Sequence, residues 1–322
     1  MLIPYINPST KNILEKIDTK LLDSKTGEIV APIVKDIPRF VKPESNYATS
    51  FGWQWNKWES IRNVQAASGF GLDKTIRKRT KFDGLNTQDK TILECGCGGG
   101  DDTKVLCSFP FSEIYSFDLS NSVERSSRIN DDTRIQLSQA SIYEIPYPDN
   151  SFDFVYCHRV LQHTPDPIQS LKFIASKVKP GGFLFAHAYK QSPEYMAEWR
   201  YKYLPITRKL PLKLIYYYVE LFGLPFHYLN QLLYRFNISR KIAYRYIPFY
   251  RKALTEDARH MSTKHMIELE KLITFDALTP AHDHPMTSES FFGTIAECGF
   301  EIINKHDPEV SPLWCTAKKI TK

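Results

Sequence analysis

Four glycines occupy the five positions from Gly96 to Gly100, directly after the apolar run TILEC. Glycine inside a strand or helix costs about 0.5–1 kcal/mol relative to alanine, so a cluster of this kind needs a structural reason. An ordinary flexible turn is one reason, and a loop whose backbone must approach a ligand closely is another. The run before the glycines has the composition of a strand, and DDTKVLCSF after them predicts a short helix. The cluster therefore predicts a glycine-rich turn between a strand and a helix.

Strand-like and helix-like segments alternate along the chain after this turn. PIQSLKFIASKV predicts a helix, as does SESFFGTIAECGF nearer the C-terminus. Strands and helices that alternate at these lengths are typical of βαβ units, in which helices cover both faces of a mostly parallel sheet. The sequence therefore predicts an α/β fold. The strands expected after the glycine turn are EIYSFDLS, RIQLSQASI, FDFVYCHRV, PGGFLFAHAY, FEIINKHDP and PLWCTAKKI.

Two parts of the chain depart from this alternation. Residues 1–45 are polar with short extended pieces, and they predict an N-terminal arm in the form of a β-hairpin. Residues 191–275 are helical in period, and they hold 14 Lys and Arg against 7 Asp and Glu. The net charge of the whole chain is +6, so all of the positive excess lies in this segment. We expect one domain over residues 46–322, with residues 191–275 inserted as a helical cap.

Several classes of protein are disfavoured by composition. The six cysteines form no CxxC pair, which argues against a zinc ribbon or a disulfide framework and suits a reducing compartment. The start MLIPYINPSTKN lacks the basic and apolar regions of a secretory signal. No run of about 18 uncharged apolar residues predicts a membrane span. We therefore expect a cytoplasmic protein, either soluble or peripheral to the inner face of a membrane.

The residues around the glycines indicate which ligand the turn suits. A dinucleotide site has the pattern G-x-G-x-x-G, with a phosphate at the N-terminus of the helix. Here Gly96 and Gly98 fit this pattern, but Asp101 takes the third position and Asp102 follows it. Two carboxylates would repel a pyrophosphate. The turn is therefore expected to hold a ligand that places no phosphate there.

The pattern that fits is E-x-G-x-G-x-G, which begins at Glu94. With it, the chain resembles the class I S-adenosylmethionine-dependent methyltransferases. The segment from Asp153 to His163 and the turn KPGG at 179–182 are similar to later motifs of the family, in the same order. The resemblance covers residues 45–190 and, more weakly, 276–322. It implies a Rossmann-like, seven-stranded sheet with a helical insertion after the fifth strand, and S-adenosylmethionine as the cofactor.

The resemblance also implies a set of cofactor-binding residues. Asp118 ends the second predicted strand, where a carboxylate can accept the ribose hydroxyls. Many family members carry an acid after the third strand that bonds the adenine amino group, whereas this chain has Ser141 there. Arg159 is a candidate for the methionine carboxylate, with a structural ion pair as the alternative. The candidate cofactor residues are Tyr47, Phe51, Glu94, Gly96, Gly98, Gly100, Asp118, Leu119, Ser141, Ile142, His158 and Arg159.

Aromatic residues gather in the segment 46–69, which predicts a helix. An aromatic face near a sulfonium gains a cation–π attraction of about 0.5–2 kcal/mol. Positions 47, 51, 55 and 58 also fall on one face of a helix, so ordinary packing explains most of them. Tyr47 and Phe51 remain the candidates for contact with the cofactor.

Methyl transfer from a sulfonium needs an acceptor held in line, and a hydroxyl acceptor also benefits from a base. His163 follows the fourth predicted strand, and the ordinary pKa of histidine near 6.5 suits a base at neutral pH. A packing or capping role for His163 is the alternative. His187, Tyr189 and His284 are candidates for substrate binding. The sequence H-D-H at 282–284 contains ligand types for a metal, but no further ligand is indicated by spacing, and no metal is predicted.

The N-terminal part resembles bacterial methyltransferases associated with surface-polysaccharide or secondary-metabolite biosynthesis, without the zinc ribbon found in many of them. We therefore expect O-methylation of a sugar or a related small-molecule intermediate. A lipid or quinone methyltransferase that reaches the membrane through residues 211–250 is one alternative, and a non-catalytic cofactor-binding partner is another. The insertion is expected to be a lid. Leu and Ile are too frequent in it for a nucleic-acid surface, and the oligomeric state stays open.

Overall fold

The computed structural model describes residues 2–58, 72–250 and 261–321. The chain divides into two compact units. The first unit comprises Met1–Thr49, Asp73–Gln191 and His282–Lys322, and the second comprises Ser50–Leu72 and Ser192–Ala281.

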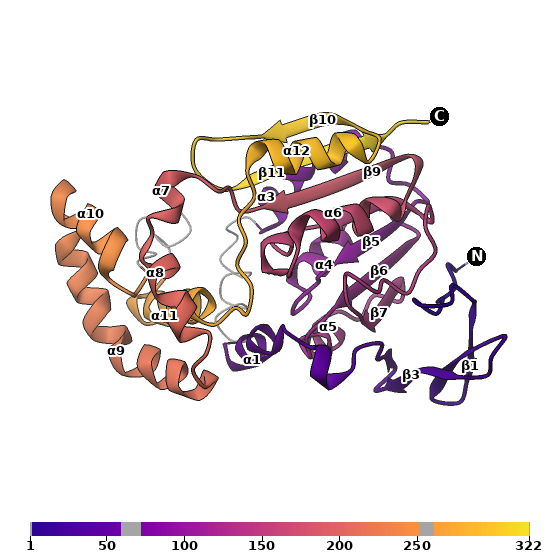
Figure 1. Ribbon diagram of the computed structural model, residues 1–322, viewed down its shortest axis with the longest axis horizontal. Helices are drawn as coiled ribbons and strands as arrows, with labels where there is room; N and C mark the ends of the chain where they lie inside the picture. Colours follow the sequence, from indigo (N-terminus) through magenta and orange to yellow (C-terminus); the bar gives the residue numbers. More distant parts are fainter. Residues whose placement is uncertain (1, 59–71, 251–260, 322) are drawn as a thin grey trace. The chain divides into compact units, whose positions relative to one another are not determined.

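A seven-stranded sheet forms the centre of the first unit, with the strand order β10-β11-β9-β8-β5-β6-β7. The strands from β5 to β9 pair in parallel, while β11 runs antiparallel to both of its neighbours. Five strands of this sheet precede the segment Ser192–Ala281 and two follow it, so the predicted fold is confirmed (Figure 1). The strands are β5 Thr91–Cys95, β6 Glu113–Asp118, β7 Ile135–Gln139, β8 Phe152–Cys157, β9 Val178–Ala188, β10 Phe300–His306 and β11 Leu313–Lys319.

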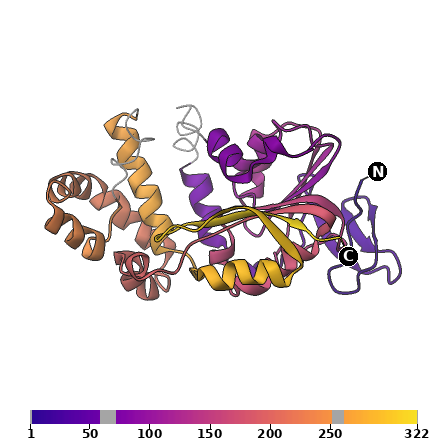
Figure 2. The ribbon, with the colours of Figure 1, turned by 90° about the horizontal axis from the view of Figure 1, so that it is seen from above.

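Helices cover both faces of this sheet because its central strands are apolar on both sides. In β8 every residue except Asp153 is buried. Helices α6 and α12 pack against each other on one face, and in Figure 2 the yellow α12 lies across the sheet from the purple helices. The helices of this unit are α3 Leu72–Thr80, α4 Asp101–Leu106, α5 Val123–Ile129, α6 Pro167–Ser176 and α12 Ser288–Glu297.

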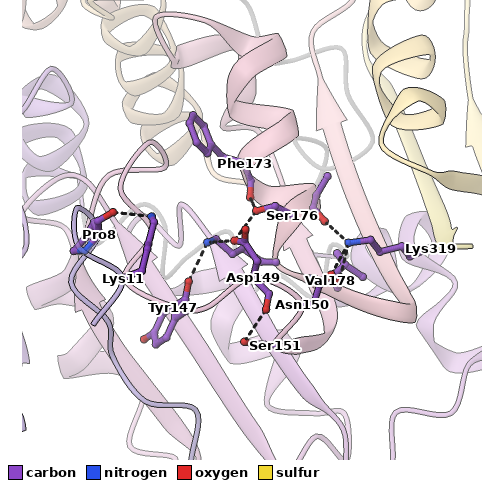
Figure 3. Close-up of polar contacts among 12 residues, drawn as sticks. Pro8, Lys11, Tyr147, Asp149, Asn150, Ser151, Phe173, Ser176, Val178 and Lys319 are labelled. Atoms are coloured by element: carbon purple, nitrogen blue, oxygen red, sulfur yellow. Dashed lines mark hydrogen bonds and ion pairs between the residues drawn. The ribbon is translucent and has the colours of Figure 1, made fainter. Parts of the chain in front are cut away.

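Charged side chains close the amino end of the sheet, where β8 and β9 begin. The buried Lys177 donates from Nζ to the carbonyl of Tyr147 at 2.9 Å and pairs with Asp149 at 2.6 Å. Lys319 donates to the carbonyl of Val178 at 2.8 Å and to Asn150 Oδ1 at 2.9 Å (Figure 3). Both lysine side chains at this end are thus hydrogen-bonded, to neighbouring polar side chains and to main-chain carbonyl groups.

The N-terminal arm forms a separate four-stranded antiparallel sheet, two strands more than the expected hairpin. Its small core consists of Leu14, Leu21 and Ala31. The carboxylate of Asp23 accepts hydrogen bonds from three side chains and two main-chain N–H groups around it. The strands are β1 Leu14–Ile17, β2 Lys20–Asp23, β3 Ile29–Val34 and β4 Ile37–Pro38.

The second unit is helical, as predicted for the insertion, although residues 251–260 lie outside the described part of the chain. Helix α9 packs on α11, and its buried face includes Ile215, Val219 and Gly223. Across the residues that the structure describes, no helix combines the length and the apolar character needed to cross a membrane. The helices are α1 Thr49–Lys57, α7 Pro193–Met196, α8 Trp199–Thr207, α9 Leu212–Leu233, α10 Asn237–Tyr246 and α11 Thr263–Leu278.

Helix α1 differs from the prediction in its extent. The predicted helix spans 46–69, whereas α1 begins at Thr49, and positions 59–69 lie outside the described residues. The buried positions of α1 include Ser50 and Gln54, and on the predicted face through 47, 51, 55 and 58 the side chain of Trp58 is buried while the other three are half-buried. Gln54 lies one turn before Trp58, and its Nε2 donates to Asp276 Oδ1 at 2.8 Å. The packing role predicted for most of the aromatics is confirmed for Trp53 and Trp58, which contact the ring of Phe275.

Candidate cofactor and acceptor site

The glycine-rich turn joins β5 to α4 at the carboxyl end of the sheet. Gly96 has φ of +80° and Gly100 has φ of +88°, a region that side chains rarely adopt. A Cβ atom on Gly96 would collide with the side chain of Val160, and one on Gly100 would lie 2.8 Å from Cα of Ser126. The turn therefore needs glycine at both positions, because neighbouring segments pack directly against its backbone.

Asp118, at the end of β6, connects two turns. Its Oδ2 accepts a hydrogen bond from the N–H of Gly98 at 2.9 Å, and its Oδ1 accepts from Ser120 N at 2.8 Å and Oγ at 2.6 Å. A carboxylate offers about four acceptor positions, so Oδ2 keeps capacity for one more donor. Leu119 follows, and its carbonyl accepts from Gln139 Nε2 at 3.0 Å. The carboxylate thus lies beside the glycine turn and can bind a ligand hydroxyl.

Glu94 lies beneath the turn, with only 1% of its surface exposed. Its Oε2 accepts from Thr103 Oγ1 at 2.6 Å and from Ser116 Oγ at 2.7 Å. Its Oε1 has no hydrogen-bond partner among the described residues. Burial raises the pKa of this carboxyl to about 8, so Glu94 is largely neutral at pH 7. Glu94 therefore ties β5 to β6 and α4 without adding charge to the site.

Arg125 supports the turn from α5, and sequence reasoning missed it. The side chain is fully buried, and Nη1 donates to the carbonyl of Gly99 at 2.6 Å and to Asp101 Oδ2 at 3.1 Å. An Arg seven residues beyond the second strand carries no distinguishing pattern in one sequence. Only the fold shows that it fixes the carbonyl side of the glycine turn.

His158 belongs to a buried chain of hydrogen bonds. Its Nδ1 bonds Asp102 Oδ2 at 2.7 Å, Tyr156 donates to the same oxygen at 2.8 Å, and Arg79 Nη1 lies 2.9 Å from its Nε2. Burial lowers the pKa of His158 to about 4. At Asp102 burial has the opposite effect, but the charge and hydrogen bond of His158 outweigh it and lower the pKa to about 2. The neutral imidazole therefore donates to Asp102 and accepts from Arg79. Arg159 is exposed, with φ of +62°.

A second group of side chains gathers around His163, in the short helix Leu161–His163 that follows β8. His163 Nδ1 lies 3.1 Å from the carbonyl of His282, so Nδ1 carries the proton and Nε2 is the basic nitrogen of the neutral ring. The Tyr189 ring lies edge-on to His163 at 5.7 Å, and the Tyr47 ring lies edge-on to His282 at 5.3 Å. His284 donates from its N–H to the carbonyl of Gln162 at 2.7 Å. Distant parts of the sequence thus meet at one place.

Five other residues were predicted for the cofactor or acceptor site, and the structure places each of them as follows. Burial raises the pKa of Tyr47, and the charges of Tyr143 and Asp118 add to this. His187 is buried, with its ring 4.9 Å from that of His158, and burial lowers its pKa. Ser141 follows β7, with Ile142 buried beside it. Phe51 belongs to α1 in the second unit.

Gln162 is a site residue that sequence reasoning missed. Its side chain is fully buried, and within the described ranges neither its amide nitrogen nor its amide oxygen has a hydrogen-bond partner. A buried unpaired polar group costs about 1–3 kcal/mol, so its retention needs an explanation. The available signal was its place in the LQH segment. In the same described ranges, no three His, Cys, Asp or Glu side chains gather into a group that could hold a metal ion.

Curated relatives align with only part of this chain. An uncharacterized protein of Synechococcus sp. is 36% identical over 106 residues, which cover 31% of this chain and 25% of that protein. Ubiquinone biosynthesis O-methyltransferase of Xanthomonas campestris pv. campestris is 30% identical over 113 residues, which cover 33% of this chain and 46% of the enzyme. Cycloartenol-C-24-methyltransferase 1 of Oryza sativa subsp. japonica is 27% identical over 144 residues, with 42% and 41% covered. The chain thus spans less than half the length of these relatives.

Among solved structures, the [4+2]-cyclase SpnF covers 85% of this chain and 97% of its own, with a TM-score of 0.49 and 13% identity. An S-adenosylmethionine-dependent methyltransferase from Mesorhizobium loti covers 77% of this chain and 100% of its own, with a TM-score of 0.47 and 15% identity.

A family model described as "Methyltransferase domain" matches residues 93–186, which run from β5 to β9. This range contains the glycine turn, Asp118 and His163. The strand order observed here is that of the class I sheet predicted from the resemblance. Residues 93–186 therefore match a methyltransferase domain and lie in a sheet of the class I type, and the match supports S-adenosylmethionine as the cofactor.

Proposed function

We propose that this protein is an S-adenosylmethionine-dependent methyltransferase that methylates a hydroxyl group of a small molecule, a sugar or a related biosynthetic intermediate. The observation that carries the proposal is the position of His163. Val160 packs against Gly96 of the glycine turn, and His163 follows three residues later with its tautomer set by the carbonyl of His282. A histidine oriented as a base thus lies on the segment that contacts the turn.

The residues at the turn fit S-adenosylmethionine. The cofactor supplies an electrophilic methyl group on a sulfonium, and it carries no phosphate. Asp118 retains acceptor capacity at Oδ2 for a ribose hydroxyl, and the Tyr47 ring lies edge-on to that of His282. Gly96 and Gly100 allow the backbone to approach the ligand closely. Asp101 is already paired with Arg125, which leaves the turn without a strong repulsive charge toward a zwitterion.

The chain's own residues would bind the acceptor and remove its proton. Nε2 of His163 would accept the proton of the acceptor hydroxyl, and the bound cofactor would supply its methyl group to that oxygen as the carbon–sulfur bond breaks and the sulfur leaves as a neutral thioether. The amide of Gln162 and the ring of Tyr189 would orient the acceptor, because both lie beside His163 in sequence or in space. Positioning of this kind supplies most of the rate in a reaction that already has a good leaving group.

A lipid or quinone acceptor is the second candidate, favoured by the many exposed Leu, Ile and Tyr side chains of α9 and α10. One of the curated relatives is a ubiquinone biosynthesis O-methyltransferase. The two candidates predict different products. Methyl label in the aqueous phase of a partitioned extract supports the sugar, and label in the organic phase supports the lipid or quinone.

The experiment compares the purified full chain with its His163→Gln variant, using methyl-labelled S-adenosylmethionine and a cell extract as the source of acceptor. Loss of a general base lowers the rate by about 10²–10⁴-fold. Binding of the cofactor, measured separately, stays at the wild-type level. His265→Gln is the matched control, because His265 lies in the first turn of α11, in the second unit, and the turn belongs to the first unit, so the rate should stay unchanged. Equal rates in wild type and His163→Gln would remove His163 from the mechanism, and binding without any transfer would support the non-catalytic alternative.

A further inference from the structure

Helix α9 is apolar on two opposite faces. One face packs on α11 and includes the buried residues Ile215, Val219 and Gly223. The opposite face carries six large apolar side chains at intervals of three or four residues, each between 52% and 71% exposed. These residues are Leu214, Tyr217, Leu221, Leu224, Tyr228 and Leu232.

The same surface continues onto the next helix. Phe236, between α9 and α10, is 68% exposed. Ile238, Ile242 and Tyr246 follow at four-residue intervals along α10 and are 50–77% exposed, and α10 contacts α9 (Figure 1). We call this set of ten side chains the α9–α10 surface.

The length of the exposed apolar stripe on α9 and α10 indicates a site of interaction with another molecule. Single exposed apolar residues are common on proteins, but contiguous apolar patches mark sites of interaction. A helix that is apolar on all sides is normally buried on all sides. The stripe runs the length of α9, so the partner must contact the helix along its axis and not only at one end.

The charges around the stripe indicate the chemistry of that partner. Residues 201–250 hold eight Lys and Arg and a single acid, Glu220. Glu220 is already paired with Lys271 at 2.9 Å. The exposed basic side chains next to the α9–α10 surface are Lys213, Arg235, Arg240, Lys241 and Arg245.

We propose that the α9–α10 surface binds the surface of an anionic lipid bilayer, with α9 lying in the plane of the interface. Apolar side chains enter the boundary between headgroups and acyl chains, while the basic side chains contact anionic headgroups. A second copy of the chain is a poorer partner, because two copies meeting through this surface would bring like charges together. The proposal does not depend on methyl transfer.

The test is co-flotation of the full chain, without cofactor, with vesicles of phosphatidylcholine alone or mixed with phosphatidylglycerol. We expect binding to the mixed vesicles that weakens as salt is added, and little binding to the neutral ones. The double variant Leu221→Ser with Tyr228→Ser should lose about tenfold or more in affinity, as should Arg240→Glu with Lys241→Glu. The matched controls are Ile29→Ser and Ile303→Ser, which alter side chains 51% and 46% exposed in the first unit and should bind like wild type. Circular dichroism of each variant checks that the fold is retained.

Three results would overturn the proposal. The first is absence of binding to the anionic vesicles, and the second is unchanged binding by both double variants. The third is a dimer in solution that Leu221→Ser with Tyr228→Ser abolishes, which would assign the surface to a second copy. Because the assay contains no methyl donor, none of these results bears on the proposed activity.

Discussion

The two ends of the seven-stranded sheet both carry buried polar side chains, but the hydrogen bonding of these side chains differs. At the amino end, Lys177 is satisfied by Asp149 and a main-chain carbonyl. At the carboxyl end, Gln162 and Oε1 of Glu94 are buried with no partner in the described part of the chain, and Asp118 keeps acceptor capacity. A satisfied polar group stabilises the fold, while an unsatisfied one costs stability unless a ligand pairs with it. Glu113 Oε2 and the hydroxyl of Tyr147, at the amino end, are also buried without a partner in the described part of the chain. The distinction between the two ends therefore depends on the residues beside the glycine turn and not on missing partners alone.

The largest effect is expected from paired substitutions of one carboxylate at each end. Asp118→Asn removes a charged acceptor beside the glycine turn and should weaken binding of S-adenosylmethionine about 100-fold, since a hydrogen bond to a charged group contributes about 1.5–3 kcal/mol. Asp149→Asn should leave binding unchanged. Isothermal titration calorimetry of both variants makes the comparison, and equal affinities would contradict the assignment of the two ends.

Gln162→Leu should affect activity and stability in opposite directions. Removal of a buried, unpaired amide should leave the free energy of unfolding unchanged or raise it by about 1 kcal/mol. The rate of methyl transfer should fall by about 10–100-fold, because the amide no longer orients the acceptor. Urea unfolding and the labelled-methyl assay measure the two quantities. A less stable variant with an unchanged rate would make Gln162 a structural residue.

Acid should affect the carboxyl end before the amino end. The pKa of His158 is about 4 when folded, below the ordinary value of 6.5, so the unfolded chain binds more protons between these pH values. The contribution of His158 to stability is therefore complete above pH 6.5 and falls as the pH drops toward 4, by about 3 kcal/mol. The raised pKa of Glu94 acts in the opposite direction between pH 8 and 4.5, so the contribution of His158 is obtained as the difference between wild type and a His158 variant. Asp149 also has a lowered pKa, so its contribution is lost only below its ordinary value of 3.8. Chemical unfolding at several pH values measures this, and His158→Gln should flatten the change between pH 6.5 and 4. An equally steep loss in that variant would assign the pH dependence to other groups.

The smallest effect is expected at the amino end itself. Lys177→Met removes the hydrogen bond to the carbonyl of Tyr147, while Asp149, whose side chain is 61% exposed, remains solvated. The free energy of unfolding should fall by about 1–2 kcal/mol. The methylation rate and the cofactor affinity should not change. A lower rate at unchanged cofactor affinity would show that this end also serves the reaction.

The sequence predicted the sheet well because alternating strand and helix patterns are local. TILEC, EIYSFD and FDFVYC could be located from composition, and the glycine turn from its spacing. The aromatics of α1 could be expected to pack, but their pattern does not reveal that Gln54 meets Asp276. The meeting of His163 with the carbonyl of His282, 119 residues away, is likewise set by tertiary structure. Gln162 and Arg125 were missed for the same reason, since their importance lies in what surrounds them.

The N-terminal arm is held together around a single carboxylate. Asn7 and Thr10, like Asp23 and Thr26, are pairs separated by two residues, the spacing that zinc ribbons give to their cysteines. Here the buried Asp23 carboxylate gathers the side chains of Asn7, Thr10 and Asn12 and two main-chain N–H groups, and these bonds, that of Thr10 first, lower its pKa. Protonation of Asp23 would weaken the bonds that hold the arm together, whereas a zinc ribbon loses its structure when a chelator removes the metal. It should keep its structure in a metal-depleted cell and lose this anchor only in strong acid.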